Sequence, residues 1–109
     1  MYIPDKGDIV WLNFHPQVGS EIKKTRPALV VSPKKYNEKT NLAIFMPITT
    51  NIKGYPFEVR VTVDNKEASI LCDQVRSLDW NKRGVSFISK IIPSTFKEAI
   101  YKLNLLINS

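Results

Sequence analysis

The sequence has one histidine, one cysteine, four glycines and no long hydrophobic run. A membrane-spanning helix needs about 18 consecutive apolar residues, and no segment approaches that length. The lone Cys72 cannot form an internal disulfide, and we expect it to be a small buried hydrophobic side chain. Residues 1–8 carry charges where an export signal requires apolar residues. These absences predict a protein of the reducing cytoplasm.

The shortage of histidine narrows the possible chemistry. With His15 alone, a nuclease using two histidines as acid and base is excluded. His15 and Cys72 do not supply a zinc site, and no G-x-S-x-G, P-loop or G-x-G-x-x-G motif occurs. The closest carboxylate group, residues 64–67, lies in a predicted turn beside Lys66, which does not suit Mg²⁺. We therefore expect no metal and no nucleotide cofactor.

The charge balance indicates a polyanionic partner. Sixteen Lys and Arg against ten Asp and Glu leave a net charge of +6. Such an excess favours nucleic acid, although many basic proteins bind none, so charge alone leaves both options open. If the chain cuts nucleic acid, it must use arginine, hydroxyl and carboxylate groups. RNA can be cleaved in this way, because its 2′-OH can attack the neighbouring phosphate while a guanidinium stabilises the phosphoryl oxygens.

The hydrophobic pattern predicts a β-rich α+β domain over residues 1–109. Alternating, β-branched and aromatic segments predict strands at 8–14, 28–32, 42–49, 57–63, 69–72 and 85–92. Pro47 is expected to end or bulge its strand, and Glu58 is expected on a solvated strand face. A helix is predicted over 95–108, with Thr95 and Glu98 at capping-box spacing. We expect five or more short antiparallel strands curled into a compact, barrel-like sheet covered by this helix.

Several blocks, taken in order along the chain, resemble the MazF/PemK family of toxins. They are Gly7-Asp8-Ile9-Val10-Trp11, Gly19-Ser20-Glu21, Arg26-Pro27-Ala28, Val30-Val31-Ser32-Pro33, Pro47-Ile48-Thr49-Thr50, Lys53-Gly54-Tyr55-Pro56-Phe57-Glu58-Val59 and Asp73-Gln74-Val75-Arg76-Ser77. Trp80, Arg83-Gly84 and the C-terminal helix follow. Each block is short, but their order and spacing together are specific and span essentially the whole chain.

The resemblance implies a compact SH3-like or CcdB-like antiparallel β-barrel with a C-terminal helix and one or two short helices. It also implies a homodimeric, ribosome-independent endoribonuclease that cuts single-stranded mRNA at specific sequences. The 2′-OH would attack, leaving a 2′,3′-cyclic phosphate and a 5′-hydroxyl without a cofactor. A cognate antitoxin with a disordered acidic tail would occupy the RNA groove.

By this resemblance, Arg26 and Thr49 fall on the family's catalytic positions, and Glu21 is the candidate proton acceptor. Arg26 would bind the scissile phosphate and stabilise the transition state; otherwise it is a surface arginine in a solvated pair. Thr49 would bond the phosphate or orient the 2′-OH; otherwise it is an ordinary strand residue. Glu21 would accept a proton, hold Arg26 or contact a base, and a plain loop acid is an equal alternative.

Further residues are predicted to bind RNA. Backbone groups of one loop, and side chains near two others, make up this set: Gly19, Ser20, Lys53, Tyr55, Asp73, Gln74 and Arg76. Arg83 would lie near the groove or the dimer seam, or have neither role. His15-Pro16 and Thr25 differ from some relatives, which would change the RNA sequence that is cut.

Two other classes of function remain open. A CcdB-like protein would poison DNA gyrase by binding, and the same barrel could host that activity. A passive SH3-like barrel would bind nucleic acid with salt-sensitive affinity and do no chemistry.

Overall fold

The computed structural model describes residues 1–14 and 25–109 of the chain. The described residues form seven strands and three helices: β1 Asp8–Asn13, β2 Thr25–Val30, α1 Lys34–Thr40, β3 Leu42–Thr49, β4 Glu58–Val63, β5 Lys66–Leu71, β6 Arg76–Asp79, α2 Trp80–Arg83, β7 Val85–Lys90 and α3 Pro93–Ile107. None of the helices in these two ranges has the length and apolar character to cross a membrane.

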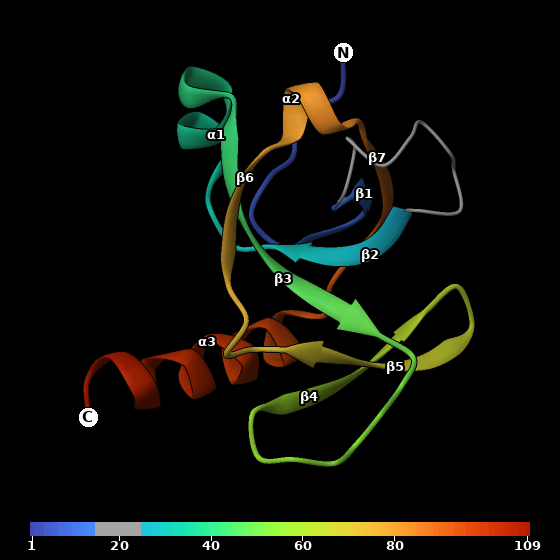
Figure 1. Ribbon diagram of the computed structural model, residues 1–109, viewed down its shortest axis with the longest axis vertical. Coiled ribbons are helices and arrows are strands. Elements are labelled where there is room, and N and C mark those ends of the chain that lie inside the picture. Colours follow the sequence, from blue (N-terminus) through green and yellow to red (C-terminus); the bar gives the residue numbers. More distant parts are fainter. Residues whose placement is uncertain (15–24) are drawn as a thin grey trace.

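All seven strands belong to one antiparallel sheet. Its order is β4-β5-β3-β2-β1-β7, and β6 pairs with β3. β5 pairs with the last residues of β3, and β6 pairs with its first residues, so β3 forms hydrogen-bonded ladders with both strands. Figure 1 shows the sheet curled into an open barrel, with α1 and α2 at one end and α3 beside β4 and β5 at the other. The predicted barrel-like sheet with a C-terminal helix is confirmed.

Two hydrophobic clusters form because successive strand side chains point to opposite faces of the sheet. We call the first the α3-side cluster; it includes Leu29, Met46 and Ile70, and Phe96, Ile100 and Leu103 of α3 pack against it. The second cluster, on the other face, includes Val30 and Phe45 as well as the residues Val10, Leu12, Phe14, Ala28, Ala43, Leu78 and Trp80. Each fully buried large aliphatic or aromatic side chain contributes about 1.5–3 kcal/mol.

Hydrogen bonds of Asn37, a residue of α1, join the amino-terminal segment to α1 and α2. Its buried side chain donates to the carbonyls of Pro4 (2.8 Å) and Ser32 (3.0 Å) and accepts from the Ser32 hydroxyl (2.6 Å). The Asn37 carbonyl accepts from the Trp80 indole at 3.0 Å. Buried polar groups are stable only when paired in this way, so Asn37 is a structural residue.

Pro47 affects the sheet as its chemistry predicts, although the strand continues past it. The β2–β3 ladder ends at the pair Ala28–Pro47, since proline has no N–H to donate. β3 nevertheless extends to Thr49 because its other edge pairs with β5 through Ile48 and Thr49. The expectation that the strand would bulge or end near Pro47 is therefore correct for one edge of β3.

Several local expectations were wrong. β2 begins at Thr25, so Arg26 lies inside the strand and not before it. Residues 76–83, for which the hydrophobic pattern predicted neither a strand nor a helix, form β6 and α2. α3 begins at Pro93, because proline suits the first position of a helix. Its N-cap residue is Ile92, which makes no side-chain hydrogen bond, so the predicted capping box of Thr95 and Glu98 does not form.

Candidate active site

Arg26 and Thr49 lie on either side of a fork where β2 and β3 part. Both residues stand two positions beyond Ala28 and Pro47, the last pair in the ladder between these strands. Alternation along each strand places Arg26 on the side of Ala28, and Thr49 on the side of Pro47, away from the α3-side cluster. In Figure 1 the start of β2 and the tip of β3 lie on the same side of the molecule. We call this place the fork.

The two side chains at the fork offer different hydrogen-bonding groups. Arg26 is exposed, and its Nη1 donates to the carbonyl of Thr25 at 3.3 Å. The half-buried Thr49 hydroxyl accepts from the N–H of Asn51 at 3.0 Å. Because a hydroxyl can donate while it accepts, Thr49 retains a proton for a phosphate oxygen. A guanidinium and a hydroxyl donor at one fork are suited to binding an anion.

A cleft of about 160 Å³ begins at Thr49 and extends under the segment that joins β3 to β4. Four residues predicted from the sequence line it: Thr49, Lys53, Tyr55 and Gln74. Of the other described residues, Asn51, Glu58 and Leu71 also line it. The tertiary structure thus brings together residues that are up to 25 positions apart in the chain, Thr49 and Gln74.

Tyr55 joins the two loops that border this cleft. Its hydroxyl donates to Asp73 Oδ1 at 2.5 Å, so both predicted RNA-binding residues belong to one hydrogen-bonded unit. Burial, together with the hydrogen bond to Asp73 and the charge of that carboxylate, raises the pKa of Tyr55 to about 12. The phenol is therefore neutral at physiological pH. Because its hydroxyl is bonded to Asp73, the ring presents its aromatic face in a fixed orientation.

Glu58 was missed by the sequence analysis, which placed it on a solvated strand face. It is buried, and its carboxylate accepts from the backbone N–H groups of Gly54 (2.8 Å) and Lys53 (3.2 Å) and from the hydroxyl of Ser69 (3.3 Å). Burial by itself raises the pKa of Glu58, but these donors and the nearby Arg60 outweigh it and hold the pKa below its ordinary value. Strand alternation could not reveal this, because the loop that covers Glu58 comes from the fold.

Arg76 and Arg83 lie elsewhere. The Arg76 guanidinium sits over the ring of Phe14, 5.4 Å from its centroid, and Arg76 pairs with Phe45 on β3. Phe45 lies four positions from Thr49 along β3, which is about 13 Å between their Cα atoms at the rise of a strand. Arg83 donates to the carbonyls of Phe14 (2.7 Å) and Asn13 (3.3 Å) and so holds the end of β1. This contact gives Arg83 a structural role.

Three predicted residues, Gly19, Ser20 and Glu21, lie outside the described residues, as does His15. Their roles stay predictions. Cys72 is fully buried as expected, and burial raises the pKa of its thiol to about 11. In the ranges 1–14 and 25–109, no three His, Cys, Asp or Glu side chains group in a way that could hold a metal ion.

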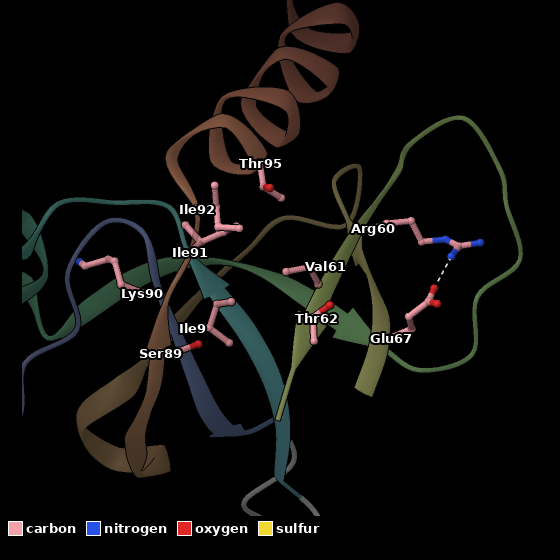
Figure 2. Close-up of a pocket in the computed structure, with 10 residues that line it drawn as sticks. All are labelled: Ile9, Arg60, Val61, Thr62, Glu67, Ser89, Lys90, Ile91, Ile92 and Thr95. Atoms are coloured by element: carbon pink, nitrogen blue, oxygen red, sulfur yellow. Dashed lines mark hydrogen bonds and ion pairs between the residues drawn. The ribbon is translucent and has the colours of Figure 1, made fainter. Parts of the chain in front are cut away.

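A larger cavity, about 430 Å³, lies between the two edge strands β4 and β7, near the start of α3. Figure 2 shows Ile9, Val61 and Ile91 in it, with Arg60 turned toward Glu67. Its cationic side chains are engaged in ion pairs, Arg60 with Glu67 and Lys90 with Asp8, each at 2.6 Å. Among the residues that the structure describes, none that was predicted to bind RNA or to act in catalysis lines this cavity.

Known proteins match this chain over nearly its whole length. The family model described as "PemK-like, MazF-like toxin of type II toxin-antitoxin system" matches residues 5–107. The endoribonuclease toxin MazF of Escherichia coli strain K12 is 42% identical over 106 residues, covering 97% of this chain and 96% of that protein. MazF from Deinococcus radiodurans, in a crystal structure, is 41% identical with a TM-score of 0.87 over 100% of both chains. In a MazE–MazF structure from the same organism, the matching chain is 38% identical with a TM-score of 0.86, covering 99% of this chain and 98% of that one. The chain described here therefore belongs to the PemK-like, MazF-like toxin family of type II toxin–antitoxin systems.

Proposed function

We propose that this chain is an endoribonuclease toxin that cuts single-stranded mRNA at specific sequences, in the cytoplasm, without a metal or an organic cofactor. The similar protein of E. coli is named an endoribonuclease toxin, and the Deinococcus relative was crystallised with MazE. We also propose, as the family resemblance implies, that the chain acts as a homodimer and is neutralised by a cognate antitoxin with an acidic, disordered tail. The net charge of +6 suits both an RNA substrate and an acidic inhibitor.

The observation that carries the proposal is the fork. Arg26 and Thr49 come from different strands, and both stand two residues beyond the last β2–β3 pair. A scissile phosphate between them would receive paired donors from the guanidinium and one donor from the hydroxyl. Both groups are held by sheet residues, so little reorganisation is needed as charge develops on the phosphoryl oxygens.

The reaction needs no further reactant. The 2′-oxygen forms a bond to phosphorus as the bond from phosphorus to the 5′-oxygen breaks, giving a 2′,3′-cyclic phosphate. The 2′-OH gives up its proton to a base, for which we propose Glu21. The 5′-oxygen takes up a proton from the Arg26 guanidinium, which regains one from water, and leaves as a hydroxyl. Arg26 and Thr49 stabilise the oxygens of the phosphoryl group during this exchange.

The cleft beside Thr49 would hold the nucleotide next to the scissile bond. Lys53 would contact a phosphate, and the ring of Tyr55 would stack on a base. Asp73 and Gln74, next to that ring, would bond base edges. Arg76 would meet a phosphate farther along the strand, because its guanidinium lies over the ring of Phe14 and does not line this cleft. Gly19 and Ser20 would present backbone donors to the RNA.

The decisive experiment incubates the purified protein with a long RNA in the presence of EDTA and maps the ends of the products. We expect cuts at a short sequence with 2′,3′-cyclic phosphate and 5′-hydroxyl ends. Arg26→Ala should slow cutting by about 10²–10³, whereas Arg60→Ala, which removes another exposed arginine from the sheet, should not slow it. Intact RNA across varied sequences would overturn the proposal, and inhibition of DNA gyrase in a parallel assay would then identify the protein as a binding poison.

A further inference from the structure

Glu58 connects the sheet to the loop that forms one wall of the cleft. The residue lies at the start of β4 and pairs with Leu71 on β5, while its carboxylate reaches back to the N–H groups of Lys53 and Gly54. The same carboxylate meets the hydroxyl of Ser69, a fully buried residue of β5. One carboxylate therefore accepts three hydrogen bonds, two from the loop and one from the neighbouring strand.

The turn that Glu58 holds has an unusual backbone. Gly54 has a φ of +79°, a conformation that residues with a side chain rarely adopt, and a Cβ at this position would meet no atom within 4 Å. The backbone angle, and not the available space, thus requires glycine here. Lys53 and Tyr55 flank Gly54 in the sequence, so the turn sets the direction of both side chains.

We propose that Glu58 is a positioning residue for RNA binding, which holds Lys53 and Tyr55 in the cleft by bonding the backbone between them. This inference rests on the proposed function, because it assigns a role within the same site. Tyr55 is also held at its hydroxyl by Asp73, so the loop is fixed at two points, one on its backbone and one on a side chain. An ordered loop does not have to lose conformational freedom when RNA binds, which strengthens binding.

Glutamine cannot replace Glu58 in this role, although it has nearly the same shape. An ionised carboxylate accepts through both oxygens, whereas an amide accepts through one and donates through the other end. In Glu58→Gln, the NH₂ group would therefore oppose either the Lys53 or the Gly54 N–H. The loop would lose one of its two backbone bonds, and the buried Ser69 hydroxyl would lose a charged acceptor.

The kinetic test compares Glu58→Gln with Glu67→Gln. The control removes an exposed carboxylate on the adjacent strand whose ion pair with Arg60 lies away from the cleft. Since Lys53 and Tyr55 would bind RNA beside the reacting atoms, we expect Glu58→Gln to raise KM about tenfold and to change kcat less than about threefold. Glu67→Gln should leave both constants unchanged. An unchanged KM in folded Glu58→Gln would overturn the inference.

A second measurement does not depend on cleavage. Amide hydrogen exchange followed by NMR should show the Lys53 and Gly54 amides protected in the wild-type protein, and exchanging at least about tenfold faster in Glu58→Gln. The amides of β3 and β5 should keep their protection. If the wild-type amides of Lys53 and Gly54 exchange as fast as those of an unstructured peptide, the inference is wrong even if Glu58→Gln fails to fold. If these amides are protected but wild-type protein cuts no RNA, the proposed function fails, and with it the role in RNA binding, whereas the loop contact stands.

Discussion

Alanine substitutions of Arg26 and Thr49, made singly and together, test whether the two side chains act on one phosphate. Arg26 would supply paired, charge-assisted donors, and loss of one such transition-state contact costs about 10²–10³ in kcat, or roughly 3–4 kcal/mol. Thr49 would supply one neutral donor, worth about 1 kcal/mol or slightly more, so Thr49→Ala should reduce kcat roughly tenfold.

The double variant shows whether the effects of the two substitutions on the cleavage rate are coupled. Residues that bind one group lose their effects together, so the loss in Arg26→Ala/Thr49→Ala should fall short of the product of the single losses by a coupling of about 1 kcal/mol. The assay is the single-turnover cleavage rate of a short RNA that contains one site, with protein in excess. A parallel cycle of Arg26→Ala with Glu67→Gln should be additive within about 0.5 kcal/mol.

Additivity in the first cycle would refute the fork as a single phosphate site. The folding of each variant is the remaining control. Arg26 is exposed, and exposed charged side chains contribute about 0–1 kcal/mol to stability, so thermal unfolding should shift little. A large loss of stability in Arg26→Ala would show that the residue supports the fold. The lower cleavage rate of this variant would then be explained by unfolding and not by the loss of a catalytic group.

The other predictions concern the surroundings of the site. Asn37→Ala should destabilise the protein by roughly 2–4 kcal/mol in chemical denaturation, because buried partners such as Ser32 lose their bonds; a change under about 0.5 kcal/mol would contradict the structural role. Arg83→Met should lower stability by about 1–3 kcal/mol through its lost bonds to Phe14, yet leave the salt dependence of RNA binding unchanged, which a filter-binding salt series would show. The ultraviolet titration difference between wild type and Tyr55→Phe should show one phenol ionising near pH 12. Because folding raises this pKa from 10.0, the stabilisation due to Tyr55 is present below pH 10 and disappears as pH rises toward 12, so ionisation near pH 10 would argue against its bond to Asp73.

Local pattern was sufficient for much of the architecture. Alternation over 57–63 and the apolar run over 42–49 predict strands because period-two side chains must face a core, and β3 and β4 occupy these segments. Pro47 predicts the end of a ladder because it lacks an N–H, and the β2–β3 ladder does end there. The single histidine and the basic charge by themselves restrict the chemistry that the chain can perform.

The site itself depended on the tertiary structure. Thr49 resembles any strand residue in the sequence, and only the divergence of β2 from β3 sets it across a fork from Arg26. Glu58 has the alternation of a solvated residue, yet a loop folds over it and supplies donors to its carboxylate. Side-chain period is a local property that the chain carries by itself, whereas the covering of a strand face depends on contacts between segments distant in sequence, which local pattern does not specify.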